Sequence, residues 1–132
     1  RGSPPDALRL WGSGKPLREF LWSEDMADAS VHVLLNVHFA DLAEECRRRG
    51  QPVRNCHINV GTGLETSIAD LAEEIRRTAG FEGRIEWDSS KPDGTMRKLC
   101  DVSRLHSLGW RHSVELHDGI RRLYEWYKNS IS

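Results

Sequence analysis

LWGSGKPLREFLW, residues 10–22, is the stretch that decides the fold, and the rest of the chain can be arranged around it. Two glycines, a serine and a proline within five residues predict a loop in its first half. Glycine lets a ligand approach the backbone, and the planar guanidinium of Arg18 suits a phosphate. Trp11 offers a flat face to a base or a sugar. The alternative is a hairpin with a solvated Arg18 and a core Trp11, and chemistry alone leaves both interpretations open.

Size and composition indicate one globular domain. The chain has 132 residues, of which 38% are hydrophobic and 30% charged, and this is ordinary for a soluble protein with a real core. The formal net charge is −1, so no overall field favours nucleic acid or an anionic membrane. No apolar run approaches the roughly 18 residues of a membrane helix. We therefore expect neither a nucleic-acid nor a membrane partner.

The cysteines and histidines predict no metal site. Cys46, Cys56 and Cys100 are odd in number and lack a CxxC spacing, which indicates thiols in a reducing compartment such as the cytoplasm. The six histidines show no HxxxH or HExxH pairing. We therefore expect surface or capping histidines and small core cysteines.

Apolar spacings of three and four residues predict about four helices. The first covers residues 23–46, with Ser23 as its N-cap, and ends at three arginines and Gly50. The second is capped by Thr66 or Ser67, of which Ser67 forms a capping-box pattern with Asp70, and it ends at Gly80.

A short helix from Ser103 and a helix over residues 114–127 complete the helical prediction. The apolar positions of the last helix predict one buried face: Leu116, Ile120, Leu123, Tyr124 and Tyr127.

Short strands between the helices predict a mixed α/β domain. The expected strands cover residues 7–10, 18–22, 56–60 and 84–87. Too few strand–helix alternations are present for a complete doubly wound Rossmann sheet. The predicted organisation is a linker or start over residues 1–7, one domain over 8–128 and a tail over 129–132.

Two loops are candidate sites. Gly61-Thr62-Gly63 follows an expected strand and precedes a helix, but Thr66 stands where a phosphate loop has its third glycine. A plain strand-to-helix turn is therefore favoured over cofactor binding. The second loop is SKPDGTMRK, residues 90–98. Its three cations suit a pyrophosphate, and Asp93 can accept hydrogen bonds from sugar hydroxyls. The alternative there is a solvated surface loop with weak ion pairs.

Five stretches resemble the C-terminal portion of the GDP-L-fucose synthase family, which are extended short-chain dehydrogenase/reductases. They are WGSGKPLREFL at 11–21, DMA at 25–27, HINVGTG at 57–63, SKPDGTMRKL at 90–99 and LHSLGW at 105–110. The first of these is shared by many nucleotide-sugar enzymes, whereas Lys-Pro-Asp-Gly-Thr narrows the match to the fucose synthase type. The resemblance covers residues 8–127.

This resemblance implies a small substrate-binding domain that closes over a GDP-sugar. By the resemblance, the full-length enzyme is a cytoplasmic homodimer that converts GDP-4-keto-6-deoxy-D-mannose to GDP-L-fucose by 3,5-epimerisation and NADPH-dependent reduction. The substrate-binding residues that it implies are Trp11, Arg18, Asp93, Lys98 and, as a less specific match, Arg84.

The family's Gly-rich cofactor fingerprint and its catalytic Ser, Tyr and Lys lie upstream of these motifs. Cys56, His57 and Cys100 do not match its catalytic cysteine or its acid/base histidine. We therefore expect no catalytic, NADP(H)-binding or metal-binding residue in this chain, no turnover by it alone, and an N-terminal Rossmann domain as its partner. The alternatives are the substrate domain of another nucleotide-sugar epimerase or dehydratase, or a free-standing module that binds a nucleotide sugar or a protein.

Overall fold

The computed structural model describes residues 6–131, which form two compact units. Unit 1 consists of residues 6–20, Leu64–Leu99 and 115–131, and unit 2 consists of Leu21–Gly63 and Cys100–Val114. The mixed α/β class without a complete sheet is confirmed. Of the expected linker and tail, residues 1–5 and 132 lie outside the described part.

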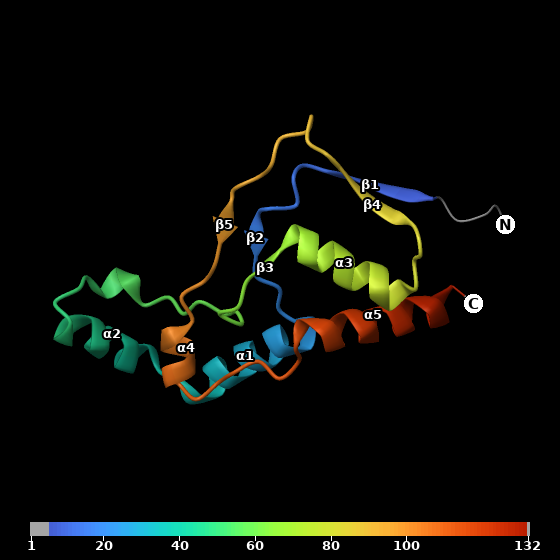
Figure 1. The fold of residues 1–132 in the computed structure, drawn as a ribbon. Coiled ribbons are helices and arrows are strands. Elements are labelled where there is room, and N and C mark those ends of the chain that lie inside the picture. Colours follow the sequence, from blue (N-terminus) through green and yellow to red (C-terminus); the bar gives the residue numbers. More distant parts are fainter. Residues whose placement is uncertain (1–5, 132) are drawn as a thin grey trace. The chain divides into compact units, whose positions relative to one another are not determined.

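The strands all lie in unit 1 and form two small sheets (Figure 1). In the first, β1 (Ala7–Trp11) pairs in parallel with β4 (Arg84–Asp88). In the second, β2 (Leu17–Arg18) lies between β3 (Thr66–Ser67), which is antiparallel to it, and β5 (Arg97–Lys98), which is parallel. Of the strand expected over residues 18–22, only Arg18 lies in β2, because only Leu17 and Arg18 have strand neighbours on both sides.

Helix α3 (Ile68–Ala79) begins and ends where its capping residues predict. The Ser67 hydroxyl accepts a hydrogen bond from the Asp70 amide at 3.0 Å, and it donates to the Asp70 carboxylate. Gly80 ends the helix in the left-handed conformation, with φ of 66°. The predicted cap and stop are both correct because each depends only on residues within one helical turn.

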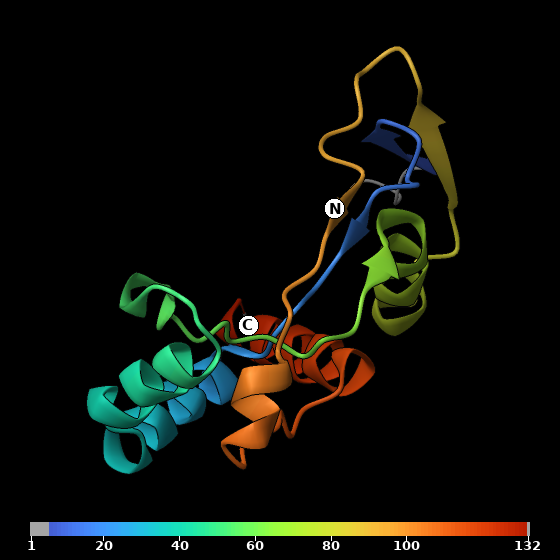
Figure 2. The ribbon, with the colours of Figure 1, turned by 90° about the vertical axis from the view of Figure 1, so that its left-hand side faces the viewer.

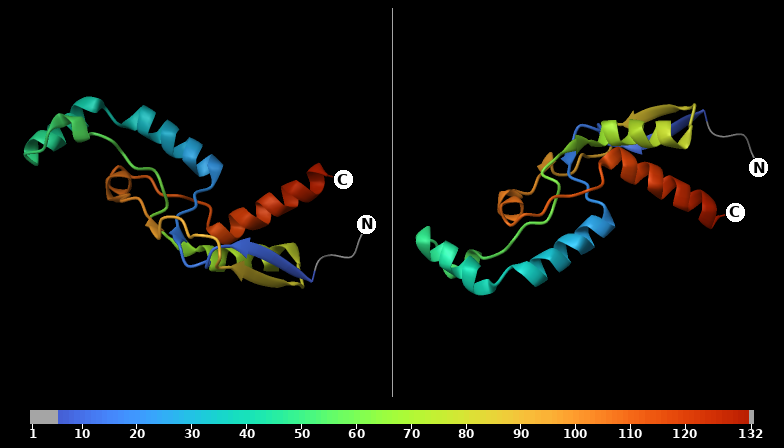
Figure 3. Two further views of the ribbon diagram at one scale, coloured as in Figure 1. Left: turned by 90° about the horizontal axis from the view of Figure 1, so that it is seen from above. Right: turned by 90° about the horizontal axis from the view of Figure 1, so that it is seen from below.

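Helix α5 (Leu116–Ser130) runs beside α3 in unit 1 (Figure 3), and the Tyr124 hydroxyl donates to the Ala79 carbonyl at 3.2 Å. The predicted buried face is wrong in two places. Leu123 is 55% exposed and Tyr127 is 52% exposed, because α3 covers only the strip around Ile120 and Tyr124. Helical spacing identifies an apolar stripe but not how much of it a neighbour covers.

Unit 2 contains α1 (Ser23–Asn36), α2 (Phe39–Arg48), the short 3-10 helix η1 (Val53–Asn55) and α4 (Ser103–Ser107) (Figure 2). The structure therefore has five α-helices among the described residues, because the single helix expected over 23–46 is two.

The break in that helix falls at Val37 and His38, whose backbones are both extended. Valine and histidine are weak helix formers, so the interruption costs little there. The predicted N-cap is also wrong: Trp22 occupies the N-cap position and Ser23 is the first helical residue. The Trp22 indole N–H donates to Glu24 at 3.1 Å.

The core of unit 2 consists of Ala29, Leu105 and Trp110, which are at most 5% exposed. Ile58 and Val60 pack against this cluster. They belong to the strand expected over residues 56–60, which does not form in the described structure. A strand needs a neighbour for its backbone hydrogen bonds, and no strand of the described residues lies beside this segment. Among residues 6–131, no helix has the length and apolarity to cross a membrane.

Candidate functional site

The candidate site begins at the edge where β1 and β4 end. Trp11 lies opposite Asp88 in the parallel register, so the loops that follow them leave the sheet together. The Gly12 amide donates to the Asp88 carbonyl at 3.0 Å. The two loops, residues 12–16 and 89–96, are therefore neighbours from their first residue.

The two loops lead into β2 and β5, which pair with each other. Arg18 of β2 lies opposite Lys98 of β5, and the Leu17 amide donates to the Met96 carbonyl at 2.8 Å. The two candidate stretches of the sequence, which are 80 residues apart at Ser13 and Asp93, are thus joined at both ends.

Between these ends, Asp93 connects the two loops. Its carboxylate accepts the Ser13 amide at 2.8 Å and the Ser13 hydroxyl at 2.6 Å. These bonds, the hydroxyl first, lower the pKa of Asp93 below its ordinary value. A Cβ on Gly12 would lie 2.5 Å from the same carboxylate, so this approach requires glycine. The described contacts use both carboxylate oxygens of Asp93 to hold the loops together.

Replacing Ser13 with alanine is expected to raise the pKa of Asp93 toward its ordinary value, because the hydroxyl bond is the largest cause of the lowering. Carbon-detected NMR titration of the Asp93 carboxyl group measures this shift. Ser90→Ala is the matched control, because Ser90 bonds Asp88 in the same way, through its hydroxyl and its amide. That control should raise the pKa of Asp88 and leave the pKa of Asp93 unchanged. The reverse pattern would contradict the assignment.

The glycine-rich loop is also fixed to the start of α3. The Gly14 carbonyl accepts the Ala69 amide at 2.9 Å, and the Pro16 carbonyl accepts the Ile68 amide at 3.0 Å. Gly14 has φ of 73°, and a Cβ there would lie 2.7 Å from the Trp87 ring. The loop is therefore rigid, and these first amides of α3 are not available to an anion.

Trp11 is 75% exposed, which excludes the alternative of a core tryptophan. The Lys91 ammonium lies 5.5 Å from the centre of its ring, within the range of a cation–π contact. The sequence counted Lys91 among three cations, but it did not predict the contact of Lys91 with Trp11 or the role of Ser13, because both depend on a loop that is distant along the chain.

Arg18 and Lys98 provide two neighbouring positive charges. The Arg18 guanidinium donates to the Leu17 carbonyl at 2.6 Å, and a Cβ on Gly94 would lie 3.3 Å from its other terminal nitrogen. Arg97, by contrast, donates to Glu65 at 2.8 Å. Within the described part of the chain, neither Arg18 nor Lys98 forms an ion pair, so both charges can act on a ligand.

Arg84 lies elsewhere. It begins β4, whereas the site lies at the end of β4, and four residues of extended strand span about 13 Å. Its guanidinium lies 3.6 Å from Glu86. The structure thus brings together Trp11, Arg18, Asp93 and Lys98, and not Arg84.

Gly61-Thr62-Gly63 does not fit a cofactor phosphate. Gly61 and Thr62 are buried, and a Cβ on Gly63 would lie 2.8 Å from the Val102 side chain. The segment is therefore packed against its own unit, although the strand expected before it does not form. No group of metal-ligating side chains occurs among residues 6–131.

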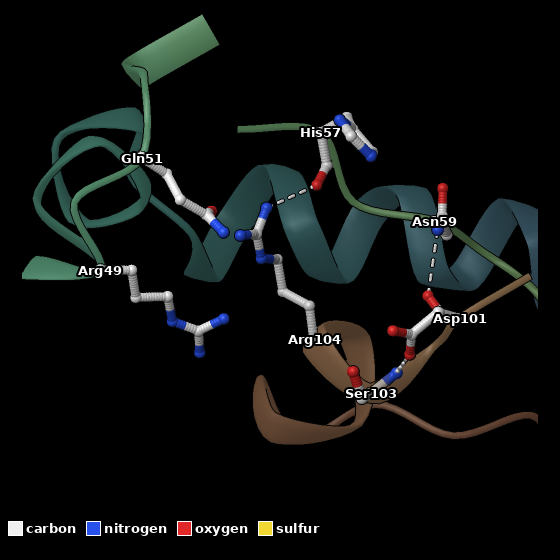
Figure 4. Close-up of a pocket in the computed structure, with 7 residues that line it drawn as sticks. All are labelled: Arg49, Gln51, His57, Asn59, Asp101, Ser103 and Arg104. Carbon is white, nitrogen blue, oxygen red and sulfur yellow. Dashed lines mark hydrogen bonds between the residues drawn. The ribbon is translucent and has the colours of Figure 1, made fainter. Parts of the chain in front are cut away.

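Unit 2 has a separate polar pocket of about 390 Å³ (Figure 4). Arg104 donates to the His57 carbonyl at 2.7 Å. The side chains of Arg49 and Gln51 point toward the side chain of Arg104 (Figure 4). Glu45 lies 2.5 Å from Arg49 and 3.7 Å from Arg104, so its single negative charge offsets part of the positive charge of the two arginines. The pocket is therefore a weaker anion site than the face around Arg18.

Comparisons with known proteins bear on this site. The model of the NAD dependent epimerase/dehydratase family matches residues 2–61. The chain is 48% identical to GDP-L-fucose synthase of Escherichia coli K12 over 93% of its own length and 36% of the relative. The predicted resemblance to the C-terminal portion of GDP-L-fucose synthases is thereby confirmed.

Solved structures agree with this result. A GDP-6-OMe-4-keto-L-xylo-heptose reductase of Campylobacter jejuni is 42% identical with a TM-score of 0.85, over 95% of this chain and 34% of that one. A GDP-mannoheptose C4 reductase of the same organism, with NADP bound, is 41% identical with a TM-score of 0.79, over 93% and 35%. The chain spans about a third of the length of the relatives that it matches.

Proposed function

We propose that this chain is the GDP-sugar-binding part of a nucleotide-sugar epimerase/reductase of the GDP-L-fucose synthase type. The whole protein then converts GDP-4-keto-6-deoxy-D-mannose to GDP-L-fucose, with NADPH as the reductant. The observation that carries the proposal is the register of Arg18 opposite Lys98, beside the two joined loops. Among the described residues, neither of these two cations forms an ion pair.

Each residue has a distinct role in the proposed site. The planar guanidinium of Arg18 donates two parallel hydrogen bonds to the pyrophosphate, and Lys98 adds a second positive charge. The exposed ring of Trp11 stacks on the base or the sugar. Asp93 holds the two loops at the spacing that the ligand requires, through its bonds to Ser13.

The proton and hydride chemistry lies outside this face. Residues 11–18 and 88–98 include no histidine, cysteine or tyrosine. The site can therefore bind and orient a nucleotide sugar, and its carboxylate Asp93 is engaged by Ser13 rather than free for proton transfer. We propose that the NADP(H) site and the catalytic groups belong to a Rossmann domain of the whole protein, that this protein is a cytoplasmic homodimer, and that the present chain alone has no turnover.

Arg18→Lys in the protein encoded by the full open reading frame is expected to weaken GDP binding tenfold or more. The variant keeps the charge but loses the two-pronged geometry, and a charge-assisted hydrogen bond contributes about 1.5–3 kcal/mol. Isothermal titration calorimetry with GDP measures the change. Guanosine lacks the pyrophosphate, so its affinity should stay the same.

Arg97→Lys is the matched control, because Arg97 is the neighbouring arginine that already pairs with Glu65. Its GDP affinity should be close to that of the wild type. Equal weakening of guanosine and GDP by Arg18→Lys would contradict the pyrophosphate assignment. Titration with UDP tests the alternative substrate class. Tighter binding of UDP than of GDP would show that the ligand is a UDP-sugar and not a GDP-sugar.

A further inference from the structure

Two of the three cysteines, which the sequence presents as separate thiols, are neighbours in unit 2. Cys46 lies near the C-terminal end of α2, and Cys56 follows η1 directly. Their sulfur atoms are 3.5 Å apart although ten positions separate them in the chain. A disulfide bond is about 2.05 Å long, so the two sulfurs need to approach by only about 1.5 Å.

We propose that Cys46 and Cys56 are a dithiol–disulfide pair that closes the loop of residues 47–55 in the presence of a low-molecular-weight disulfide such as oxidised glutathione. Cys56 is the first to react, because it is half-buried whereas Cys46 is fully buried. This assigns a modification site to unit 2 and does not depend on the proposed function of unit 1.

The exchange is balanced in two steps. The Cys56 thiolate attacks one sulfur of oxidised glutathione, breaks its disulfide and releases one glutathione thiolate. The Cys46 thiolate then attacks the Cys56 sulfur of the mixed disulfide and releases the second glutathione thiolate. The two protons lost by the cysteines are taken up by the two released thiolates. The cysteines are oxidised by two electrons, and the glutathione disulfide is reduced by two.

The surroundings of Cys56 make this reaction slow near neutral pH. Burial, followed by the hydrogen bond with Cys46, raises the pKa of the Cys56 thiol, while Arg104 and Arg47 oppose the shift. Since only the thiolate attacks, the rate of bond formation should increase with pH.

The bond would restrain one wall of the polar pocket in Figure 4. Arg49 and Gln51 lie inside the loop that it closes, and His57 directly follows Cys56. Oxidation should therefore slow amide hydrogen exchange in residues 47–55, because the loop gains a second covalent connection.

The test exposes the folded, reduced chain to oxidised glutathione at pH 8, blocks the remaining thiols with an alkylating reagent and analyses tryptic peptides by mass spectrometry. Trypsin cuts at Arg47 and Arg54, between the two cysteines, so a linked peptide pair identifies the bond. The expected product is the Cys46–Cys56 disulfide, with Cys100 recovered as a glutathione adduct or an alkylated thiol.

Three comparisons make the test specific. Cys100→Ser should form the bond as the wild type does, whereas Cys46→Ser and Cys56→Ser should give only mixed disulfides with glutathione. The urea-unfolded wild type should give all three pairings, so selectivity for Cys46–Cys56 reports the native arrangement. Glutathione adducts at both cysteines of the folded chain, or pairing with Cys100, would overturn the proposal.

Discussion

Asp25→Asn is expected to lower the free energy of unfolding by about 2–4 kcal/mol. The residue is 5% exposed, and its carboxylate accepts three hydrogen bonds. The Ser113 hydroxyl donates at 2.7 Å, and the amides of Ser113 and Val114 donate at 3.1 and 2.9 Å. An asparagine keeps the shape but replaces one acceptor oxygen by a donor, so buried N–H or O–H groups lose their acceptor. Urea unfolding followed by circular dichroism measures the difference.

Asp28→Asn is the control, because Asp28 lies one turn further along α1 and accepts a single bond, from the Trp110 indole at 2.8 Å. Its remaining amide oxygen can still accept that bond, so the expected loss is about 1 kcal/mol or less. Equal losses in the two variants would show that the hydrogen-bonded arrangement of Asp25 does not stabilise unit 2.

The effect of Asp25 should also depend on pH. Burial by itself raises the pKa of this carboxyl group, but the bonds from Ser113 and Val114 together outweigh burial and lower it below 3.8. A folded-state pKa below the unfolded value means that the stabilisation is fully present above the unfolded pKa and is lost as the pH falls through the folded pKa. The difference between wild type and Asp25→Asn should thus be constant near neutral pH and should shrink below about pH 3.8.

Leu105→Ala should lower the free energy of unfolding by about 2–5 kcal/mol, because it removes a buried side chain and leaves a cavity. Leu105 is 0% exposed and packs in the cluster with Ala29 and Trp110. Leu123→Ala removes the same atoms from a position that is 55% exposed. It should lower the free energy of unfolding by about 1 kcal/mol or less, because the Leu123 side chain buries little apolar area when the chain folds. Urea titrations of the two variants provide the comparison, and equal losses would contradict this description of the core.

The elements that were predicted correctly have local causes. The start and the end of α3 follow from Ser67, Asp70 and Gly80, whose interactions stay within one helical turn. β1 and β4 were also expected, because each is a short run bounded by turn residues. Two errors are local, namely the N-cap of α1 and the break at Val37 and His38. Other errors concern features that need a distant neighbour. Residues 56–60 do not form a strand because no described strand accepts their hydrogen bonds, and Leu123 is exposed because α3 covers only part of the stripe on α5.

The sequence by itself determined the residue types of the candidate site: a glycine-rich loop with Trp11 and Arg18, and a second loop with Asp93 and Lys98. These follow from composition and turn chemistry, which are local properties. Only the tertiary structure decided that Arg18 lies opposite Lys98, since strand register is set by backbone pairing between distant segments.

The same reason applies to the individual contacts. The role of Asp93 depends on Ser13, which is 80 positions away, and the proximity of Cys46 and Cys56 depends on how the chain turns after α2. A sequence pattern contains no such distances. The sequence therefore determined which groups this chain can offer to a ligand or an oxidant, and folding decided which of them meet.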